Sequence, residues 1–214
     1  MTTLDEVAGA AAAEQLAVIG GFHPAPGEDL GGTVLLLGPA EPGFWAYVTA
    51  APEFADGAAD PLDRWSARVI GGMAERLGAR AHFPFDGPPY RPFYSWALRT
   101  GRVWASPVTL LVHETAGLLV SFRGALALPG RIDLPPAPPC PCDTCPGKPC
   151  LTACPAGALT GAGYDVPACH TYLETPAGEE CLAAGCRVRT SCPVSQGYAR
   201  LAVQSAYHMR LFHK

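Results

Sequence analysis

The stretch that decides the fold of this chain reads Cys142-Asp143-Thr144-Cys145-Pro146-Gly147-Lys148-Pro149-Cys150-Leu151-Thr152-Ala153-Cys154-Pro155. Its cysteine spacing is Cys-x2-Cys-x4-Cys-x3-Cys-Pro. A second set follows as Cys169 and then Cys181-x4-Cys186-x5-Cys192-Pro193. Both sets hold four cysteines and both end in Cys-Pro. The ninth cysteine, Cys140, lies just before the first set, so the cysteines of this chain form a doubled pattern with one residue left over.

This pattern is a variant of the bacterial ferredoxin run, with a middle spacing about two residues longer. In that run three close thiolates bind one cluster, while the cysteine before proline binds the other cluster. Applied to both sets, the rule exchanges Cys154 and Cys192 between them. The sequence therefore predicts two [4Fe-4S] clusters. The predicted ligands of cluster I are Cys142, Cys145, Cys150 and Cys192, and those of cluster II are Cys154, Cys169, Cys181 and Cys186.

Structural zinc is the alternative use of eight cysteines, because four-cysteine zinc sites also use Cys-x2-Cys pairs. Only one such pair occurs here, at Cys142 and Cys145, and zinc does not account for two Cys-Pro endings. Cys140 is predicted not to be a ligand, because Cys140-x-Cys142 is a short spacing for two ligands of one cluster. The flanking Pro139 and Pro141 also restrict its backbone. The alternative is that Cys140, and not Cys142, is a ligand of cluster I.

The composition describes a compact globular protein, with 49% hydrophobic and 16% charged residues. The formal net charge of −4 and the scattered arginines give no support for nucleic-acid binding. The N-terminus is acidic and lacks the basic region and apolar stretch of a secretory signal. No apolar run approaches the roughly 20 residues of a membrane span. We therefore expect a cytoplasmic protein without membrane contact, in which metal ligation is the ordinary use of so many cysteines.

The distribution of residues predicts two modules. Residues 1–134 contain all four tryptophans and no cysteine. Residues 135–141 are rich in proline and are expected to form an extended connector. Residues 142–214 contain the predicted cluster ligands and end in a helix whose packed face is expected to include Leu201, Ser205, Met209 and Phe212.

A mixed α+β pattern is expected in the first module. Asp60-Pro61 is a helix start, and apolar residues at helical spacing continue to Gly78. Further helices are expected around residues 3–15 and 92–100. Short apolar runs predict strands at 17–22 and 33–38, and a hairpin formed by residues 108–113 and 118–128. The fold class expected is therefore α+β.

Several stretches of the chain resemble the cobalamin-dependent epoxyqueuosine reductases and the related reductive dehalogenases. The resemblance is carried, in order, by Arg91-Pro92 opening a helix, its Gly101 exit, the segment Leu110 to Gly117, Leu119 to Gly124, Cys154 to Leu159, and Cys169 to Leu173. The first module is also similar to the cobalamin-trafficking decyanase of animals. That similarity lies in Thr33 to Leu37, Asp60 to Asp63, Phe122 to Gly124, and Leu128 to Gly130.

These families imply a nitroreductase-like α/β module that holds a corrinoid, followed by a ferredoxin-like module that supplies electrons. Carried over from the reductases, a proton donor lies just before the helix opened by Arg91-Pro92, and Asp86 is the nearest candidate for this catalytic role. The simpler reading of Asp86 is a turn aspartate that bonds its own backbone.

The resulting expectation is an oxidoreductase that passes electrons through two [4Fe-4S] clusters to a corrinoid, for reductive chemistry or corrinoid processing. A low-potential electron donor protein and a small-molecule substrate or the corrinoid itself are the expected partners. Two alternatives stay open. One is a ferredoxin-type carrier with a non-catalytic first domain, and the other is a cobalamin chaperone.

Overall fold

The computed structural model describes residues 2–214 and has an α+β fold with small antiparallel sheets. The chain forms two compact units. Unit 1 comprises the residues up to Arg102 together with Ser121–Pro138, and unit 2 comprises Val103–Val120 together with Pro139–Lys214. These limits differ from the predicted modules, because residues 103–120 belong to the unit that contains the cysteines.

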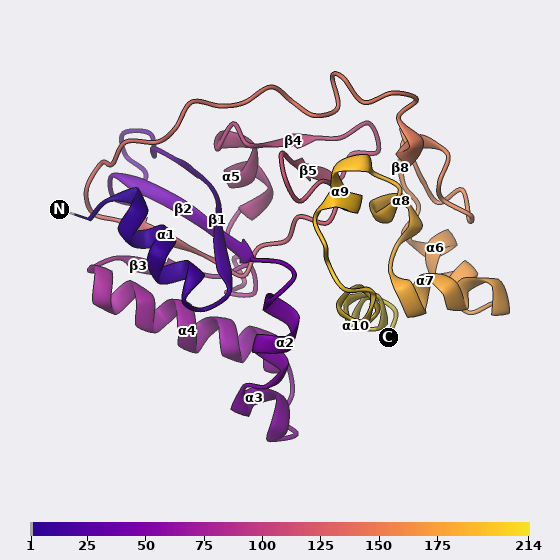
Figure 1. Cartoon of the computed structure of the whole chain (residues 1–214), viewed down its shortest axis with the longest axis horizontal. Coiled ribbons are helices and arrows are strands. Elements are labelled where there is room, and N and C mark those ends of the chain that lie inside the picture. Colours follow the sequence, from indigo (N-terminus) through magenta and orange to yellow (C-terminus); the bar gives the residue numbers. More distant parts are fainter. Residues whose placement is uncertain (1) are drawn as a thin grey trace. The chain divides into compact units, whose positions relative to one another are not determined.

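Unit 1 is built on a four-stranded antiparallel sheet with the strand order β1-β2-β6-β3 (Figure 1). The strands are β1 (Leu16–Phe22), β2 (Thr33–Pro39), β3 (Arg80–His82) and β6 (Gly124–Leu128). Every residue of β2 and β6 is buried, as continuous apolar runs in the middle of a sheet should be. The predicted strands at 17–22 and 33–38 are confirmed within one residue.

The helices of unit 1 are α1 (Leu4–Ala12), α2 (Phe44–Thr49), α3 (Pro52–Ala55), α4 (Pro61–Leu77) and α5 (Phe93–Arg99). A capping box between Thr3 and Glu6 begins α1. The long helix α4 packs against β6 and β3 (Figure 1). It begins and ends where the sequence predicts, with Gly78 at φ 62° closing it. Asp60 occupies the N-cap position, yet its side chain makes no capping hydrogen bond.

Unit 2 has short elements joined by many turns. Two-residue and three-residue strands form two small antiparallel pairs, β4 (Val103–Ala105) with β5 (Leu111–His113), and β7 (Leu159–Thr160) with β8 (Gly163–Tyr164). The helices are η1 (Pro149–Leu151), α6 (Val166–Leu173), η2 (Pro176–Gly178), α7 (Glu179–Ala184), α8 (Arg187–Thr190), α9 (Pro193–Gly197) and α10 (Ala202–Phe212). Residues 131–140, which lead into the cysteines, have no regular secondary structure.

The predicted hairpin of 108–113 with 118–128 is wrong. Strand β5 pairs instead with β4, and only a single bridge joins His113 to Gly117. Residues 124–128 form β6, which lies between β2 and β3 in the sheet of unit 1. Two apolar runs on either side of a short turn-like segment suggested a hairpin, but residues 124–128 form a central strand whose five residues are all buried. Pairing with distant strands therefore prevailed over pairing with the nearest one.

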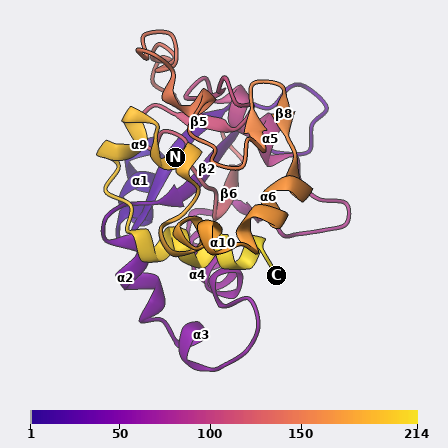
Figure 2. The same cartoon turned by 90° about the vertical axis from the view of Figure 1, so that its right-hand side faces the viewer.

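The predicted packed face of the terminal helix is also largely wrong. In α10 the buried residues are Gln204, Ser205 and Ala206, while Leu201 and Phe212 are exposed. The helix packs against α7; it is seen nearly end-on in Figure 1 and from the side in Figure 2. The Phe212 ring stacks on His170 of α6 with ring centroids 4.6 Å apart. No helix formed by residues 2–214 combines the length and apolar character needed to span a bilayer.

Candidate metal centres

Four cysteines of unit 2 line one small apolar pocket. They are Cys142, Cys145, Cys150 and Cys192. Two of them come from the turn region before η1, Cys150 lies within η1, and Cys192 precedes Pro193 at the start of α9. The rest of the pocket wall is mostly apolar and includes Val112 and Leu118 of the 103–120 segment. Residues far apart in the sequence thus place four thiols around one space.

The thiols of this first group lie close enough to influence one another. Burial raises the pKa of Cys142 to about 12, and the neighbouring Cys140, Cys150 and Cys192 add to the rise. Burial also raises the pKa of Cys150, together with the nearby Cys145 and Cys192. Metal ligation requires thiolates, so loading this group with metal would release protons, and the positive charge of the metal would offset the repulsion between the thiolates that form.

A second group contains the other four predicted ligands. Cys154 lies before Pro155, Cys169 lies on α6, Cys181 lies on α7, and Cys186 begins α8. Burial raises the pKa of Cys169, where the Tyr164 hydrogen bond acts in the opposite direction and Cys186 and Cys154 raise it further. Burial also raises the pKa of Cys181, together with Cys186 and Cys169. Cys186 thus raises the pKa of both Cys169 and Cys181, and Cys154 raises that of Cys169.

One hydrophobic core supports both groups. Val108, Val112, Leu118, Leu159 and Val188 are buried there together with Cys150 and Cys192. Three cysteines of the two groups, Cys142, Cys154 and Cys186, pack against the same core. This apolar core lowers the local dielectric around the buried sulfur atoms of Cys150 and Cys192, which strengthens the electrostatic interactions that they make.

Hydrogen-bond donors lie near the cysteines of the second group, and the sequence did not predict them. The Tyr164 hydroxyl donates a hydrogen bond to Sγ of Cys169 at 3.4 Å, and the backbone N–H of Leu159 donates to Sγ of Cys154 at 3.5 Å. The guanidinium of Arg189 donates to the carbonyl of Leu118 at 2.6 Å. Burial lowers the pKa of Arg189, while Cys186 and Tyr164 act in the opposite direction. No sequence signal marks these residues, because contacts across turns bring them to the cysteines.

The four cysteines expected for cluster I line one pocket, whereas the four expected for cluster II are linked only through the pKa values of Cys169 and Cys181. Cys140 contributes to the raised pKa of Cys142 but does not line the pocket of the first group.

All nine cysteines are free thiols. Among residues 2–214, no three or more His, Cys, Asp or Glu side chains form a group that could hold a metal ion. Ligands of one zinc ion meet at about 2.3 Å from a single atom, whereas the ligands of a four-iron cluster each bind a different iron.

Asp86, the candidate proton donor, lies in unit 1 at the edge of an open hollow. Its carboxylate accepts a hydrogen bond from the backbone N–H of Phe83 at 3.2 Å, and its own N–H donates to the Phe83 carbonyl. This is the arrangement of a turn aspartate. His82 and Tyr90 line the same hollow. Burial lowers the pKa of His82, with Arg91 and Arg80 as further causes, so its imidazole is neutral at neutral pH.

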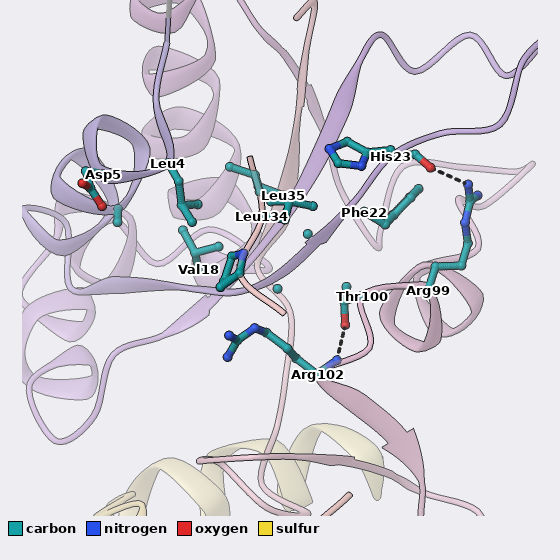
Figure 3. Close-up of a pocket in the computed structure, with 14 residues that line it drawn as sticks. Leu4, Asp5, Val18, Phe22, His23, Leu35, Arg99, Thr100, Arg102 and Leu134 are labelled. Atoms are coloured by element: carbon teal, nitrogen blue, oxygen red, sulfur yellow. Dashed lines mark hydrogen bonds between the residues drawn. The ribbon is translucent and has the colours of Figure 1, made fainter. Parts of the chain in front are cut away.

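Unit 1 also contains a pocket of about 750 Å³ (Figure 3). The apolar part of its wall is formed by Val18, Leu35 and Leu134. Its cationic side chains are those of Arg99 and Arg102. Arg99 is held in place by Glu28, at 2.8 Å, and its guanidinium lies over the Phe22 ring at 4.1 Å from the centroid. The volume lies within the range of pockets that enclose drug-sized ligands.

No protein-family model, curated protein or solved structure matches this chain.

Proposed function

We propose that unit 2 binds two [4Fe-4S] clusters and that the protein transfers electrons through them as an iron-sulfur oxidoreductase. The observation that carries this proposal is the position of Cys192, the Cys-Pro cysteine of the second set, in one pocket with Cys142, Cys145 and Cys150. The other Cys-Pro cysteine, Cys154, lies near enough to Cys169 to raise its pKa. Two-cluster ferredoxins exchange their Cys-Pro cysteines between the clusters, and a pair of independent zinc sites has no need of such an exchange.

The chemistry of the donors supports the same proposal. All eight donors are cysteine sulfurs, which suit iron-sulfur clusters and zinc but not magnesium or calcium. An apolar core surrounds them, and backbone N–H and Tyr164 hydrogen bonds reach two sulfurs of the second group. Hydrogen bonds to sulfur and burial are the means by which proteins set the reduction potential of such clusters.

The two proposed clusters would lie near one another. Cys150 and Cys154 share one short segment and serve different groups, as do Cys186 and Cys192. Each group is therefore tied to the other through two segments of the chain. This arrangement favours electron transfer between the two groups, and we propose that a low-potential donor protein delivers the electrons.

For the finer fold we propose a nitroreductase-like module in unit 1 and a ferredoxin-like module in unit 2, as the sequence resemblance implies. The acceptor would then be a corrinoid bound to unit 1, where cobalt supplies the reductive chemistry. The pocket near Arg99 is the candidate place for the corrinoid or for a small-molecule substrate. A complete corrinoid is larger than the drug-sized ligands that such pockets enclose, so part of it would stay exposed.

A ferredoxin-type carrier with a non-catalytic unit 1 is the second candidate. The observation in its favour is the hydrogen bond from the Phe83 N–H to Asp86, which gives this carboxylate a role in the turn. In that case unit 1 would protect or dock the cluster unit and would have no reaction of its own.

Anaerobic reconstitution with iron and sulfide tests the proposed clusters. We expect about eight iron and eight sulfide per chain, a broad visible absorption that bleaches on reduction, and an electron paramagnetic resonance signal in the reduced protein. Tightly bound zinc in place of iron would overturn the proposal.

Addition of cob(II)alamin to the reconstituted protein separates the two candidate functions. Corrinoid binding with the lower base displaced changes the cobalt spectrum to the base-off form, and reduced clusters should then lower the oxidation state of cobalt. An unchanged cobalamin spectrum with intact clusters would favour the electron carrier.

A further inference from the structure

Ser106 is a buried serine that follows β4 and lines the pocket of the cluster I cysteines. Only 6% of the residue is exposed. Its main chain is fully paired, because its N–H donates to the Leu110 carbonyl at 2.8 Å and its carbonyl accepts from the Thr109 N–H at 2.9 Å. Its hydroxyl oxygen, in contrast, is buried and has no hydrogen-bond partner within the part of the chain that the structure describes.

A buried hydroxyl without a partner is uncommon and indicates a group that completes the site. The remaining wall of this pocket consists of prolines, Val112 and Leu118 together with the four cysteines and Lys148. Lys148 is exposed, so its ammonium group is solvated. Ser106 is the only residue lining this pocket that has a hydroxyl group. The acceptors that line the same pocket are the four cysteine sulfurs.

We propose that the Ser106 hydroxyl donates a hydrogen bond to a sulfur atom of cluster I and thereby raises the reduction potential of that cluster. This inference rests on the proposed function, because the acceptor belongs to the bound cluster or to one of its thiolates. Reduction adds one negative charge, and a hydrogen bond stabilises a more negative acceptor more strongly. The bond therefore favours the reduced state over the oxidised state.

The position of Ser106 makes this effect specific to one cluster. The pocket that it lines contains the four cysteines of the first group and none of the second. The second group has its own donors in Tyr164 and the Leu159 N–H. Removal of the Ser106 hydroxyl should therefore shift one midpoint potential and leave the other in place.

The test is a redox titration of the reconstituted full chain under anaerobic conditions, followed by electron paramagnetic resonance. In Ser106→Ala, one of the two midpoint potentials should fall by about 59 mV, which corresponds to a tenfold change in the equilibrium constant of a one-electron reduction. Ser121→Ala is the matched control. Its hydroxyl is also buried and without a partner among the described residues, but it belongs to unit 1.

Iron content separates the failure of this inference from failure of the proposed function. Eight iron per chain with both potentials unchanged in Ser106→Ala would overturn the role of Ser106 alone, whereas a wild-type protein without iron-sulfur clusters would overturn both. If Ser106→Ala loads less iron, the isosteric pair Ser106→Thr and Ser106→Val repeats the comparison. The threonine variant should keep the higher potential, and equal potentials in the pair would contradict the inference.

Discussion

The backbone N–H of Leu118 donates a hydrogen bond to the hydroxyl oxygen of Ser195 at 2.8 Å, and both groups are buried. Ser195 lies on α9, directly after Cys192 and Pro193, whereas Leu118 lies on the segment that separates the two parts of unit 1. The same hydroxyl donates to the Ala116 carbonyl at 3.4 Å. A side chain at Gly117 would collide with Ser195, so the two segments are in close contact.

Ser195→Ala should destabilise unit 2 by about 1 to 3 kcal/mol, because the Leu118 N–H would lose its partner while staying buried. Chemical denaturation of the reconstituted protein, followed through the visible absorption of the clusters, measures this loss. Ser191→Ala is the control, since the Ser191 hydroxyl only donates to the Val188 carbonyl one helical turn away. Equal stability of the two variants would contradict the role given to Ser195.

Replacement of the Cys-Pro cysteines tests the exchange of ligands between clusters. Cys192→Ala should damage the cluster held by Cys142, Cys145 and Cys150, and Cys154→Ala should damage the other one. Iron analysis should give about half of the wild-type content for each variant. The two variants should also retain different electron paramagnetic resonance signals. If Cys192→Ala spares the first cluster and removes the one that contains Cys186, the assignment is wrong.

Cys140→Ser should leave the iron content unchanged, because eight other cysteines already supply the ligands of two clusters. Cys140 stands beside Cys142 but does not line the pocket of the first group. Iron and sulfide analysis after reconstitution checks this expectation. A loss of about half the iron would identify Cys140 as a ligand in place of Cys142.

Asp86→Asn should slow corrinoid-dependent reduction of an organic halide by at least about a hundredfold if Asp86 is the proton donor. The asparagine carbonyl can still accept from the Phe83 N–H, so the turn is preserved. Corrinoid and iron content should therefore equal those of the wild type. A near-normal rate would restrict Asp86 to its structural role in the turn.

The ion pair between Glu53 and Arg68 should make unit 1 sensitive to acid. The Arg68 guanidinium donates to the buried Glu53 carboxylate at 3.0 Å and holds its pKa below the usual value. A depressed folded-state pKa adds stability above the unfolded value of about 4.5, and this stability is lost as the pH falls through the folded value.

Glu53→Gln should therefore lower the free energy of unfolding by about 1 to 2 kcal/mol at pH 7. The difference from the wild type should shrink as the pH falls through the lowered folded-state pKa of Glu53, because its carboxyl then becomes neutral like the amide of glutamine. Denaturant titrations at several pH values measure it. Asp29→Asn is the control, because the Asp29 side chain is 94% exposed and its pair with Arg80 is solvated. A pH-independent difference for Glu53→Gln would contradict the argument.

The arrangement of eight cysteines in two sets of four, each ending in Cys-Pro, is evident from the sequence. Spacing and the two Cys-Pro endings predicted that Cys192 joins Cys142, and the structure places both in one pocket. The long helix from Pro61 and the strands near residues 17–22 and 33–38 were also predictable, because periodic apolar residues, proline and Gly78 mark them locally. These features depend on residues close together in the chain or on a repeated ligand pattern.

The unit that each segment joins depends on its packing in the folded protein and could not be predicted from local sequence. Residues 103–120 pack with the cysteines because Val108, Val112 and Leu118 fill the core beside Cys150, although the sequence placed them with the first module. Ser106 lines the pocket of the first group although it lies far from these cysteines in the sequence, and Tyr164 bonds to Cys169 across a turn of five residues; no spacing pattern marks either residue.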